Sequence, residues 1–514
     1  MTDTAHALGA SRTLWELVAR RAALTPDHPV LLQGDRMLTF GELRDRAERC
    51  AAGLWEMGVR PGTVVAWQLP TRIETAILSF ALTRVGAVQS PVIPFYRDRE
   101  VGFALRASRA EFFAVPGVWR GFDHTELARR LGARGVFEAY DSLPDGDPAV
   151  LPPPPSPDSG QDVRWIYWTS GTTSDPKGVL HTDRSLIAGG SCLAHALHLT
   201  SDDVGSMAFP YAHIAGPDYT VMLLLYGFPA VMFEQFALPG ALEEYRKHGV
   251  TVAGGSTAFY AMFLAEQRKL PPGEKLIPSL RLLAGGGAPK PPEVYHAVVR
   301  EMGCQLTHGY GMTEVPMITM GSPDDTAENL ATTEGRPPAG MEIRIARDAS
   351  GNGEVRLRGE AVCRGYLDPA QTATAFDEDG FLITGDVGHL TPSGHLVLTG
   401  RIKDIIIRKG ENISAKEIED LLHRHPAVGD AAVIGLPDPE RGERVCAVVE
   451  PAERPPGAAP LTLAAVTDFL RGEGLSVHKL PEQLEVVEEL PRNDTLRKVL
   501  KYKLRERFTA VDPA

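Results

Sequence analysis

Apolar residues in the first third of the chain follow two alternating spacings. Mainly apolar runs at 63–69 and 87–93 are typical of strands. Between them, residues 71–86 place their apolar side chains near one face of a helix, and Gly86 favours ending the helix there. Strands that alternate with helices predict a parallel α/β fold for this part of the chain.

The pattern changes after Gly400. Beyond this glycine, strands are predicted at 402–409, 430–435 and 444–450, and helices at 415–425 and 461–473. These elements are enough for a small α+β domain. A second candidate boundary is the Pro-rich segment 151–160, which predicts a loop because proline cannot sustain a helix or a central strand.

Length and composition agree with a multidomain globular protein. A chain of 514 residues is too long for one ordinary core. Hydrophobic residues make up 43% and charged residues 23%, as in ordinary globular proteins. The formal net charge of −13 disfavours a nucleic-acid groove, so we expect no nucleic-acid partner.

Cysteine usage and the apolar segments favour a cytoplasmic protein without a membrane span. The five cysteines are scattered, with no spacing typical of zinc sites or disulfide frameworks. The first residues do not resemble a signal peptide. The most apolar stretch, 219–233, contains Gly227 and Pro229 and is too short to span a membrane, so it predicts a helix end followed by a buried strand.

The densest chemical signal is the segment 167–178, Tyr-Trp-Thr-Ser-Gly-Thr-Thr-Ser-Asp-Pro-Lys-Gly, after a predicted strand at 163–168. Glycine and hydroxyl residues bring N–H and O–H donors close to an anion, and Lys177 adds a mobile positive charge. A triphosphate fits this chemistry. The lysine spacing differs from that of a P-loop. Taken alone, the segment is also compatible with a turn that binds no ligand.

Two further segments carry candidate nucleotide contacts. In His-Gly-Tyr-Gly-Met-Thr-Glu, 308–314, Tyr310 offers a flat face for a base, Thr313 a hydroxyl, and Glu314 a hard oxygen for Mg²⁺. Glycines at 283–289 allow the backbone to approach a planar ring. Each segment by itself is also compatible with an ordinary turn.

The last two signals are an acidic strand end and a basic tail. Asp386 can accept two ribose hydroxyls, and Arg401 can donate to a ribose or a phosphate. A capped turn and a surface charge pair are the alternatives. The basic run at 490–505 is compatible with a solvated helix face.

Together, in order and separation, the four signals resemble the adenylate-forming superfamily, which includes acyl-CoA synthetases, luciferase and peptide-synthetase adenylation domains. The resemblance covers nearly the whole chain from 38–43 onward. It implies a large α/β N-terminal domain of several subdomains over 1–400, a hinge at 401–404, and a small mobile α+β domain over 405–514.

The resemblance also implies roles for individual residues. ATP and AMP contacts are expected at Thr169, Ser170, Gly171, Thr172, Thr173, Lys177, Gly287, Ala288, Pro289, Tyr310, Gly311, Met312, Thr313, Asp386 and Arg401. Tyr310 is expected to stack on adenine. Thr169 and Glu314 are expected near Mg²⁺, and the residues with catalytic roles are His213, Glu314 and Lys498. Lys403 matches the hinge, and the thiol-binding loop matches Lys409, Gly410, Glu411 and Asn412.

Two positions depart from the family pattern. Ser174 replaces a usual glycine in the phosphate loop. The terminal motif, usually Pro-Arg-Thr-x-x-Gly-Lys, lacks its glycine and has one extra residue, so counting forward from Pro491 reaches Arg497 and counting backward from Arg505 reaches Lys498. We favour Lys498, because a slender ammonium can reach between a carboxylate and a phosphate as a point charge. We also expect a helix over 499–505.

These observations predict an acyl-CoA synthetase that uses ATP, Mg²⁺ and coenzyme A to activate a small carboxylic acid. The segments 94–101 and 115–122 resemble those of bacterial ligases for medium-chain or alicyclic acids. A ligase that loads an acyl carrier protein and a non-catalytic nucleotide-binding protein are the alternatives. Candidate acid-pocket residues, each equally compatible with the core, are Phe209, Tyr211, Tyr219, Phe259 and Met317.

Overall fold

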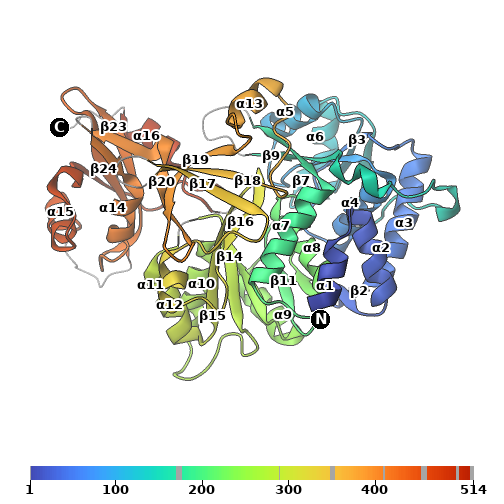
Figure 1. The fold of residues 1–514 in the computed structure, drawn as a ribbon, viewed down its shortest axis with the longest axis horizontal. Coiled ribbons are helices and arrows are strands. Elements are labelled where there is room, and N and C mark those ends of the chain that lie inside the picture. The colour runs from blue at the N-terminus through green and yellow to red at the C-terminus, as the bar shows by residue number, and fades with distance from the viewer. Residues whose placement is uncertain are drawn as a thin grey trace.

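A computed structural model describes residues 2–169, 176–288, 290–347, 353–408, 411–452, 460–493 and 497–509. A larger N-terminal part and a smaller C-terminal part lie side by side, with the chain entering the smaller part after β20 (Leu396–Arg401) (Figure 1). The large N-terminal domain and small C-terminal domain confirm the mixed α/β fold expected from the sequence.

The longest sheet carries the first predicted strands. Its strand order is β10 (Gly178–Thr182), β9 (Val163–Trp168), β4 (Val88–Pro91), β3 (Val64–Trp67), β5 (Phe112–Val115) and β8 (Val136–Glu138). All neighbours are parallel except β10, which is antiparallel to β9. The predicted strands at 63–69, 87–93 and 163–168 and the parallel α/β pattern are therefore confirmed.

Between β3 and β4 lies α4 (Ile73–Val85), which Gly86 ends with a left-handed φ of 79°. Every residue of α4 is buried, so the helix does not have the single apolar face expected from its spacing. The reason is tertiary: α4 is covered by α3 (Phe40–Glu56) as well as by the sheet.

The Pro-rich segment is not a domain boundary. It begins directly after the short 3₁₀ turn η1 (Pro148–Val150) and ends within a second one, η2 (Pro157–Gln161). The strand that follows it, β9, pairs with β4 from before it, with Gln89 opposite Trp165. One sheet therefore continues across the segment.

A second sheet has the order β11 (Gly205–Met207), β12 (Ala230–Met232), β1 (Pro29–Gln33) and β2 (Arg36–Thr39). The apolar stretch 219–233 forms the end of α8 (Ala215–Tyr226) and then β12, as predicted. Gly227 ends α8 with a φ of 77°.

A third sheet has the order β13 (Val252–Gly255), β14 (Leu282–Gly286), β15 (Gln305–Met312) and β16 (Val315–Met320). Its strand ends are rich in glycine, and the backbones approach so closely that a Cβ on Gly285 would clash with the carbonyl oxygen of Gly255. Glycine is needed here because only a residue without a side chain permits this approach.

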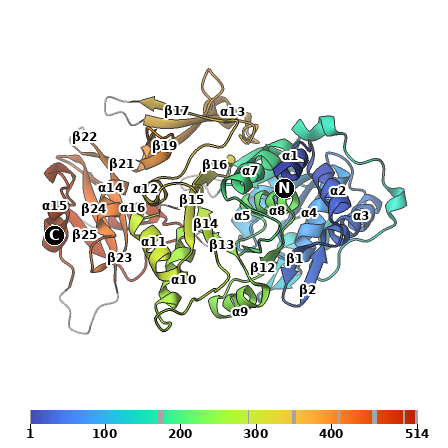
Figure 2. The ribbon, with the colours of Figure 1, turned by 60° about the horizontal axis from the view of Figure 1, so that its bottom comes forward.

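A fourth, antiparallel sheet links the two parts. Its order is β17 (Met341–Arg347), β18 (Gly353–Gly359), β19 (Leu382–Leu390) and β20. From a second viewpoint the sheet lies above the third sheet and next to the smaller domain (Figure 2). A separate two-stranded ribbon is formed by β6 (Val118–Trp119) and β7 (Phe122–Asp123).

The C-terminal part has its own core. Its sheet contains β21 (Ile405–Arg408), β22 (Glu411–Ser414), β23 (Val428–Asp438), β24 (Gly442–Pro451) and β25 (Gln483–Val486). The helices are α14 (Ala415–Leu422), α15 (Leu463–Gly472) and α16 (Lys501–Thr509). One core cluster, including Ile406, Val433 and Leu470, and a second, including Ile434 and Phe508, contain only residues of this part.

Two predicted boundaries in this part were wrong. Residues 402–404 form the 3₁₀ turn η4 (Ile402–Asp404) and the strand begins at Ile405. The last helix begins at Lys501, because Val499 pairs instead with Arg492 in an isolated β-bridge.

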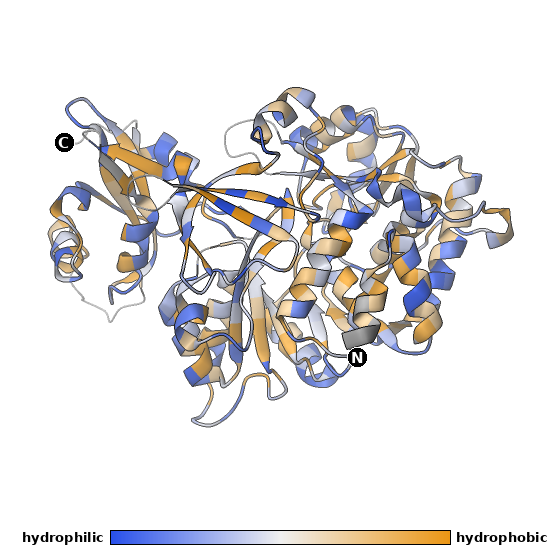
Figure 3. Cartoon of the chain, viewed as in Figure 1, coloured by the Kyte–Doolittle hydropathy of each residue, from blue (hydrophilic) through white to orange (hydrophobic). Residues whose placement is uncertain are grey.

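The remaining helices pack around the N-terminal sheets. They are α1 (Thr2–Gly9), α2 (Leu14–Leu24), α5 (Asp98–Ser108), α6 (His124–Arg130), α7 (Asp183–Ala196), α9 (Leu238–His248), α10 (Thr257–Gln267), α11 (Pro292–Ala297), α12 (Ala327–Thr332) and α13 (Pro369–Ala375). Hydrophilic residues gather on the outward faces of many helices, and apolar residues follow the inner strands (Figure 3). Among the described residues, no helix is long and apolar enough to cross a membrane.

Candidate active site

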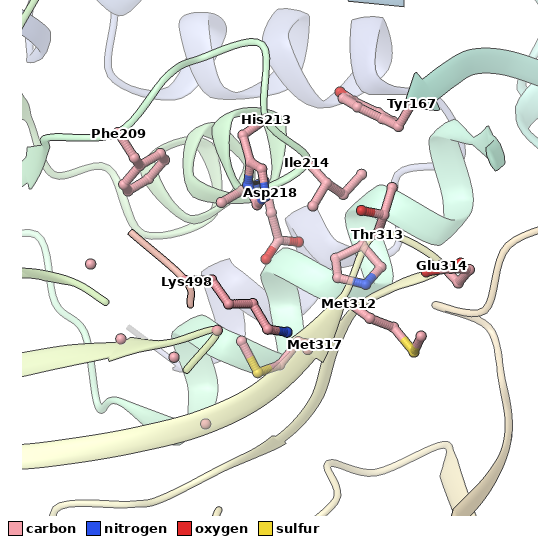
Figure 4. Close-up of a pocket in the computed structure, with 18 of the residues that line it drawn as sticks. Tyr167, Phe209, His213, Ile214, Asp218, Met312, Thr313, Glu314, Met317 and Lys498 are labelled. Atoms are coloured by element: carbon pink, nitrogen blue, oxygen red, sulfur yellow. Dashed lines mark hydrogen bonds between the residues drawn. The ribbon is translucent and has the colours of Figure 1, made fainter. Parts of the chain in front are cut away.

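A cavity of about 690 Å³ lies where four N-terminal sheets meet the C-terminal segment. Its walls include the β9–β10 turn, the glycine-rich ends of β13 to β15, the first turns of α8, and Lys498. Figure 4 shows side chains from these elements projecting into it. Segments distant in the sequence thus share one chamber.

The β9–β10 hairpin brings Thr169 and Lys177 to one end of the cavity. The Thr169 N–H donates to the Lys177 carbonyl at 3.0 Å, and the Lys177 N–H donates to Thr169 Oγ1 at 3.3 Å. The Lys177 ammonium lies 4.9 Å from the centre of the Tyr366 ring. Ser170, Gly171, Thr172 and Thr173 lie outside the described residues, so their phosphate contacts stay a prediction.

Glu314 is a buried carboxylate on the same side. It lies between β15 and β16, lines the cavity, and accepts a hydrogen bond from the Tyr366 hydroxyl at 2.8 Å. Its neighbours Gly311, Met312 and Thr313 also line the cavity. A hard carboxylate oxygen and the Thr169 hydroxyl suit Mg²⁺, which proteins usually bind through one or two carboxylates together with phosphate oxygens. No group of three or more His, Cys, Asp and Glu in the described ranges could hold a metal by itself.

Asp386, in β19, accepts hydrogen bonds from one residue of β15 and one of β20. Arg401, directly opposite it in the β19–β20 ladder, donates from Nε to Asp386 Oδ1 at 2.5 Å, and the Tyr310 hydroxyl donates to Oδ2. Burial raises the pKa of Tyr310 well above its ordinary value, so this hydroxyl remains a donor. Arg401 lines the cavity, whereas Tyr310 and Asp386 are absent from its lining. The predicted adenine and ribose contacts of these two residues stay predictions.

Three nucleotide contacts were predicted in the glycine-rich segment after β14. Of these residues, Gly287 lines the cavity and Ala288 does not. The Ala288 carbonyl instead accepts hydrogen bonds from His308 Nε2 at 2.9 Å and from Thr257 Oγ1 at 3.2 Å. Pro289 lies outside the described residues. The planar backbone of β14 therefore faces the cavity through the glycines before Ala288.

His213 lies just before α8 and lines the cavity. Its Nδ1 accepts a hydrogen bond from the Ala215 N–H at 3.2 Å. Burial lowers the pKa of His213 to about 4, so the ring is neutral near pH 7. A neutral imidazole that accepts at Nδ1 carries its proton on Nε2, which makes His213 a hydrogen-bond donor.

Lys498, and not Arg497, enters the cavity. Burial and the nearby positive charges of Arg401 and Lys403 lower the pKa of Lys498 to about 8, against the opposing effect of Asp386. Arg497 is turned outward, where it pairs with Glu489 at 2.7 Å. The structure thus places the residue favoured from the sequence inside the chamber.

Lys403 lies in η4, between β20 and β21, and also lines the cavity. Burial, then the charge of Arg401, lowers its pKa. The adjacent Asp404 pairs with Arg505 at 3.0 Å. The predicted thiol-binding loop is only partly described: Lys409 and Gly410 lie outside the described residues, and for Glu411 and Asn412 only the backbone pairing with β21 is described.

The candidate acid-pocket residues divide into two groups. Phe209, Tyr219 and Met317 line the cavity. Tyr211 and Phe259 pack with core residues instead. The centre of the Tyr211 ring lies 6.0 Å from the centre of the Trp67 ring, and the centre of the Phe259 ring lies 5.0 Å from that of Phe236. Aromatic residues next to a pocket motif cannot be assigned to cavity or core by residue type alone.

The sequence analysis missed several cavity residues, among them Asp218 and Tyr366 and the apolar residues Ile93, Leu193, Leu197 and Met222. Asp218 carried a usable signal, because it is the one charged residue of the otherwise apolar helix α8. An acidic side chain in such a helix needs a structural or chemical reason.

Both parts of the chain match family profiles. Residues 18–367 match the AMP-binding enzyme family, and residues 417–496 match the AMP-binding enzyme C-terminal domain. Profile matches to both parts bear out the resemblance seen in the motifs.

Relatives of known activity extend over nearly the whole chain. A 3-[(3aS,4S,7aS)-7a-methyl-1,5-dioxo-octahydro-1H-inden-4-yl]propanoyl:CoA ligase of Mycobacterium tuberculosis is 34% identical, covering 96% of this chain and 99% of the relative. A salicyl-AMP ligase / salicyl-S-ArCP synthetase of the same organism is 32% identical, with coverages of 94% and 88%.

A solved structure agrees with these relatives. O-succinylbenzoate coenzyme A synthetase from Bacillus subtilis, in complex with ATP and magnesium ion, matches with a TM-score of 0.82 and 28% identity over 95% of this chain and 98% of the other. Motifs, profiles, relatives and fold agree. This chain belongs to the AMP-binding enzyme family and is an adenylate-forming ligase of the acyl-CoA synthetase-like superfamily.

Proposed function

We propose that this protein is an acid–CoA ligase acting in two steps. In the first, a carboxylate oxygen bonds to the α-phosphorus of ATP and the bond to the bridging oxygen breaks, giving acyl-AMP and pyrophosphate. In the second, the thiol of coenzyme A attacks the acyl carbon and AMP leaves with its electron pair, giving the thioester. The thiol proton is released.

The observation that carries the proposal is the continuity of the cavity. Its lining includes the polar residues Thr169, Lys177 and Arg401 and the apolar residues Leu193 and Phe209. Lys498 and His213 also line this chamber. A site that holds a nucleotide and an acid side by side converts their encounter into an intramolecular reaction.

We assign the charge-handling work to three side chains. Carboxylate attack on the α-phosphate brings two anions together, so donors must offset both the repulsion and the charge that grows in the transition state. Lys498 supplies an ammonium that lines the cavity, and Lys177 a second cation. The Nε2–H of His213 supplies a neutral donor toward the acid.

Thr169 and Glu314 would hold Mg²⁺ together with the triphosphate. The ion would neutralise phosphate charge. The Tyr366 hydroxyl orients the Glu314 carboxylate through its hydrogen bond of 2.8 Å. Through the ion, these residues would help to position the phosphates.

For the second step we propose a mobile domain over 405–514 that turns about a hinge at 401–404, with 1–400 as the fixed part. Support comes from the separate cores and from the short turn η4 that joins them. The present arrangement, with Lys498 in the cavity, suits adenylation. Rotation would withdraw Lys498 and bring the loop 409–412 to the acyl-AMP, so one site performs both steps.

Coenzyme A is the proposed acceptor, and the alternative is an acyl carrier protein. The octahydroindenyl-propanoyl:CoA ligase named above supports the first, and the salicyl-S-ArCP synthetase supports the second. An acceptor assay distinguishes the two alternatives. The enzyme and one accepted acid are incubated with coenzyme A or with holo-carrier protein, and the thioester is measured by mass spectrometry. We expect coenzyme A to be acylated at least about tenfold faster.

For the acid we propose the medium-chain or alicyclic class. The apolar walls formed by Leu193, Leu197 and Met222 support this proposal. A panel of linear, alicyclic and aromatic acids assayed for acid-dependent exchange of pyrophosphate into ATP tests the first step. A protein that binds ATP but shows no exchange with any acid would contradict the proposed reaction and favour a non-catalytic nucleotide-binding protein.

A further inference from the structure

The cavity wall contains a carboxylate that neither half of the proposed reaction uses. Asp218, in the first turn of α8, is 3% exposed and lines the cavity. Its Oδ1 atom is buried and has no hydrogen-bond partner among the described residues. In Figure 4 its side chain lies among the pocket residues, between the labelled His213 and Lys498. A buried carboxyl oxygen without a partner is costly, so it requires an explanation.

Helix α7 packs closely against this carboxylate through two glycines. A Cβ on Gly189 would lie 2.5 Å from Asp218 Oδ1, and a Cβ on the adjacent Gly190 would lie 2.6 Å from the Cβ of Val221. The glycine pair therefore lets α7 approach α8 closely enough to enclose Asp218. Ile214 and Met222, from the same helix region, add apolar side chains to the cavity wall.

A second unpartnered polar atom lines the same cavity. The hydroxyl of Tyr167, at the end of β9, is buried and has no hydrogen-bond partner within the described part of the chain. Burial raises the pKa of Tyr167 well above its ordinary value, and the charges of Tyr211 and Asp218 contribute in the same direction. Asp218 and Tyr167 thus line the same chamber from different elements, α8 and β9.

We propose that the acid substrate carries a hydroxyl group on its acyl portion, and that Asp218 and Tyr167 bind that hydroxyl. In the complex, the substrate O–H exchanges a hydrogen bond with the Asp218 carboxyl group, and the Tyr167 O–H donates to the substrate oxygen. This inference rests on the proposed function, and it narrows the medium-chain or alicyclic class to its hydroxylated members. Asp218 is a specificity-determining residue and does not touch the reacting atoms.

The charge state of Asp218 favours a substrate with a hydroxyl group over one with an amino group. Burial raises the pKa of Asp218 to about 8, so near pH 7 the group is mainly a neutral carboxylic acid. A neutral acid exchanges hydrogen bonds readily with a neutral hydroxyl. An ammonium would need an ionised, desolvated partner, and the Lys498 ammonium in the same chamber would repel it.

Matched pairs of acids test the inference. We compare octanoic with hydroxyoctanoic acids, cyclohexanecarboxylic with hydroxycyclohexanecarboxylic acids, and each with its amino analogue, using kcat/KM for pyrophosphate release. We expect the wild type to prefer one hydroxylated acid by at least about tenfold, because a site built to bond a hydroxyl rejects the analogue that lacks it. Preference for the unsubstituted or the amino acid would overturn the inference.

Three variants show whether Asp218 sets that preference. Asp218→Leu should abolish or reverse the preference for the hydroxylated acid, and Asp218→Asn, which keeps a hydrogen-bonding group, should retain part of it. Met222→Leu, a volume-conserving change on the same helix, should leave the hydroxyl-to-unsubstituted ratio unchanged. An unaltered ratio in Asp218→Leu would contradict the inference, provided that ATP still raises the melting temperature of the variant.

Binding separates this inference from the proposed function. If no acid releases pyrophosphate, calorimetric titration of the same pairs in the presence of ATP still measures the affinity of the pocket for each acid. If the hydroxylated acid binds more tightly and Asp218→Leu loses this difference, the inference is supported and the proposed ligase reaction is contradicted. Equal binding of both members of every pair would overturn the inference alone.

Discussion

The backbone N–H of Lys498 donates to the side-chain Oδ1 of Asn493 at 2.9 Å, and the Asn493 N–H donates back to the Lys498 carbonyl at 2.9 Å. These two bonds, with the bridge between Arg492 and Val499, fix the register of the C-terminal turn. The lysine therefore faces the cavity, and Arg497 faces solvent beside Glu489.

The first prediction concerns this pair of basic residues. Lys498→Ala should lower the rate of acyl-AMP formation by roughly 10²-fold or more, the scale expected when one transition-state donor is removed. Thioester formation from synthetic acyl-AMP should change much less, because the proposed rotation withdraws Lys498. Arg497→Ala is the matched control and should be mild in both assays. The reverse pattern would assign the adenylation role to Arg497.

The second prediction concerns pH. The pKa of Lys498 is lowered to about 8, so the ammonium is present below that pH and is lost as the pH rises through it. The kcat/KM for pyrophosphate release should therefore fall above about pH 8, by about tenfold per unit once the lysine is mainly neutral. The measurement is a pH–rate profile. An identical alkaline limb in Lys498→Ala would assign the titration to another group.

The third prediction concerns the hinge. Lys403→Pro fixes φ at a position in η4 where the proposed rotation requires freedom. Acyl-AMP formation should persist, and thioester synthesis should fall by about 10²-fold because the second arrangement is not reached. Lys403→Ala, which removes the same side chain and leaves the backbone free, is the control. Equal loss of both steps in Lys403→Pro would argue against a hinge.

The fourth prediction concerns Mg²⁺. Glu314→Gln keeps the shape of the side chain and removes the charge that a hard cation prefers, so half-saturation should need roughly tenfold more Mg²⁺. Tyr366→Phe is the control, because it removes the hydrogen bond to Glu314 and retains the carboxylate charge. Magnesium titrations of pyrophosphate release measure both. If Glu314→Gln titrates like the wild type, the carboxylate does not hold the ion.

The fifth prediction concerns backbone strain before Lys498. Arg497 adopts a left-handed φ of 56° and occupies the position just before the lysine, where the family motif has glycine. A side chain in this conformation costs roughly 1–2 kcal/mol relative to glycine. Arg497→Gly should therefore unfold at higher denaturant than Arg497→Ala, although both lose the contact with Glu489. Equal midpoints in urea titrations would show that the turn carries no such strain.

The sequence alone determined the fold class and the location of most site segments. Repeated strand and helix spacings predicted the parallel sheet, because side-chain periodicity follows directly from backbone geometry. Gly86 and Gly227 marked helix ends where the structure has left-handed φ angles. The family motifs predicted the region around Lys177 and Glu314, since residue types at short spacing stay together however the rest of the chain folds.

Only the tertiary structure decided which side chains face the chamber. Tyr211 and Phe259 pack into the core whereas Phe209 lines the cavity, and their residue types do not distinguish them. The choice between Arg497 and Lys498 depended on hydrogen bonds across a turn. The unpaired oxygen of Asp218 depended on how closely α7 approaches α8 at Gly189. The first and third of these features arise from contacts between distant segments, and the second arises from hydrogen bonds within one turn. Patterns of residue type do not encode either kind of contact.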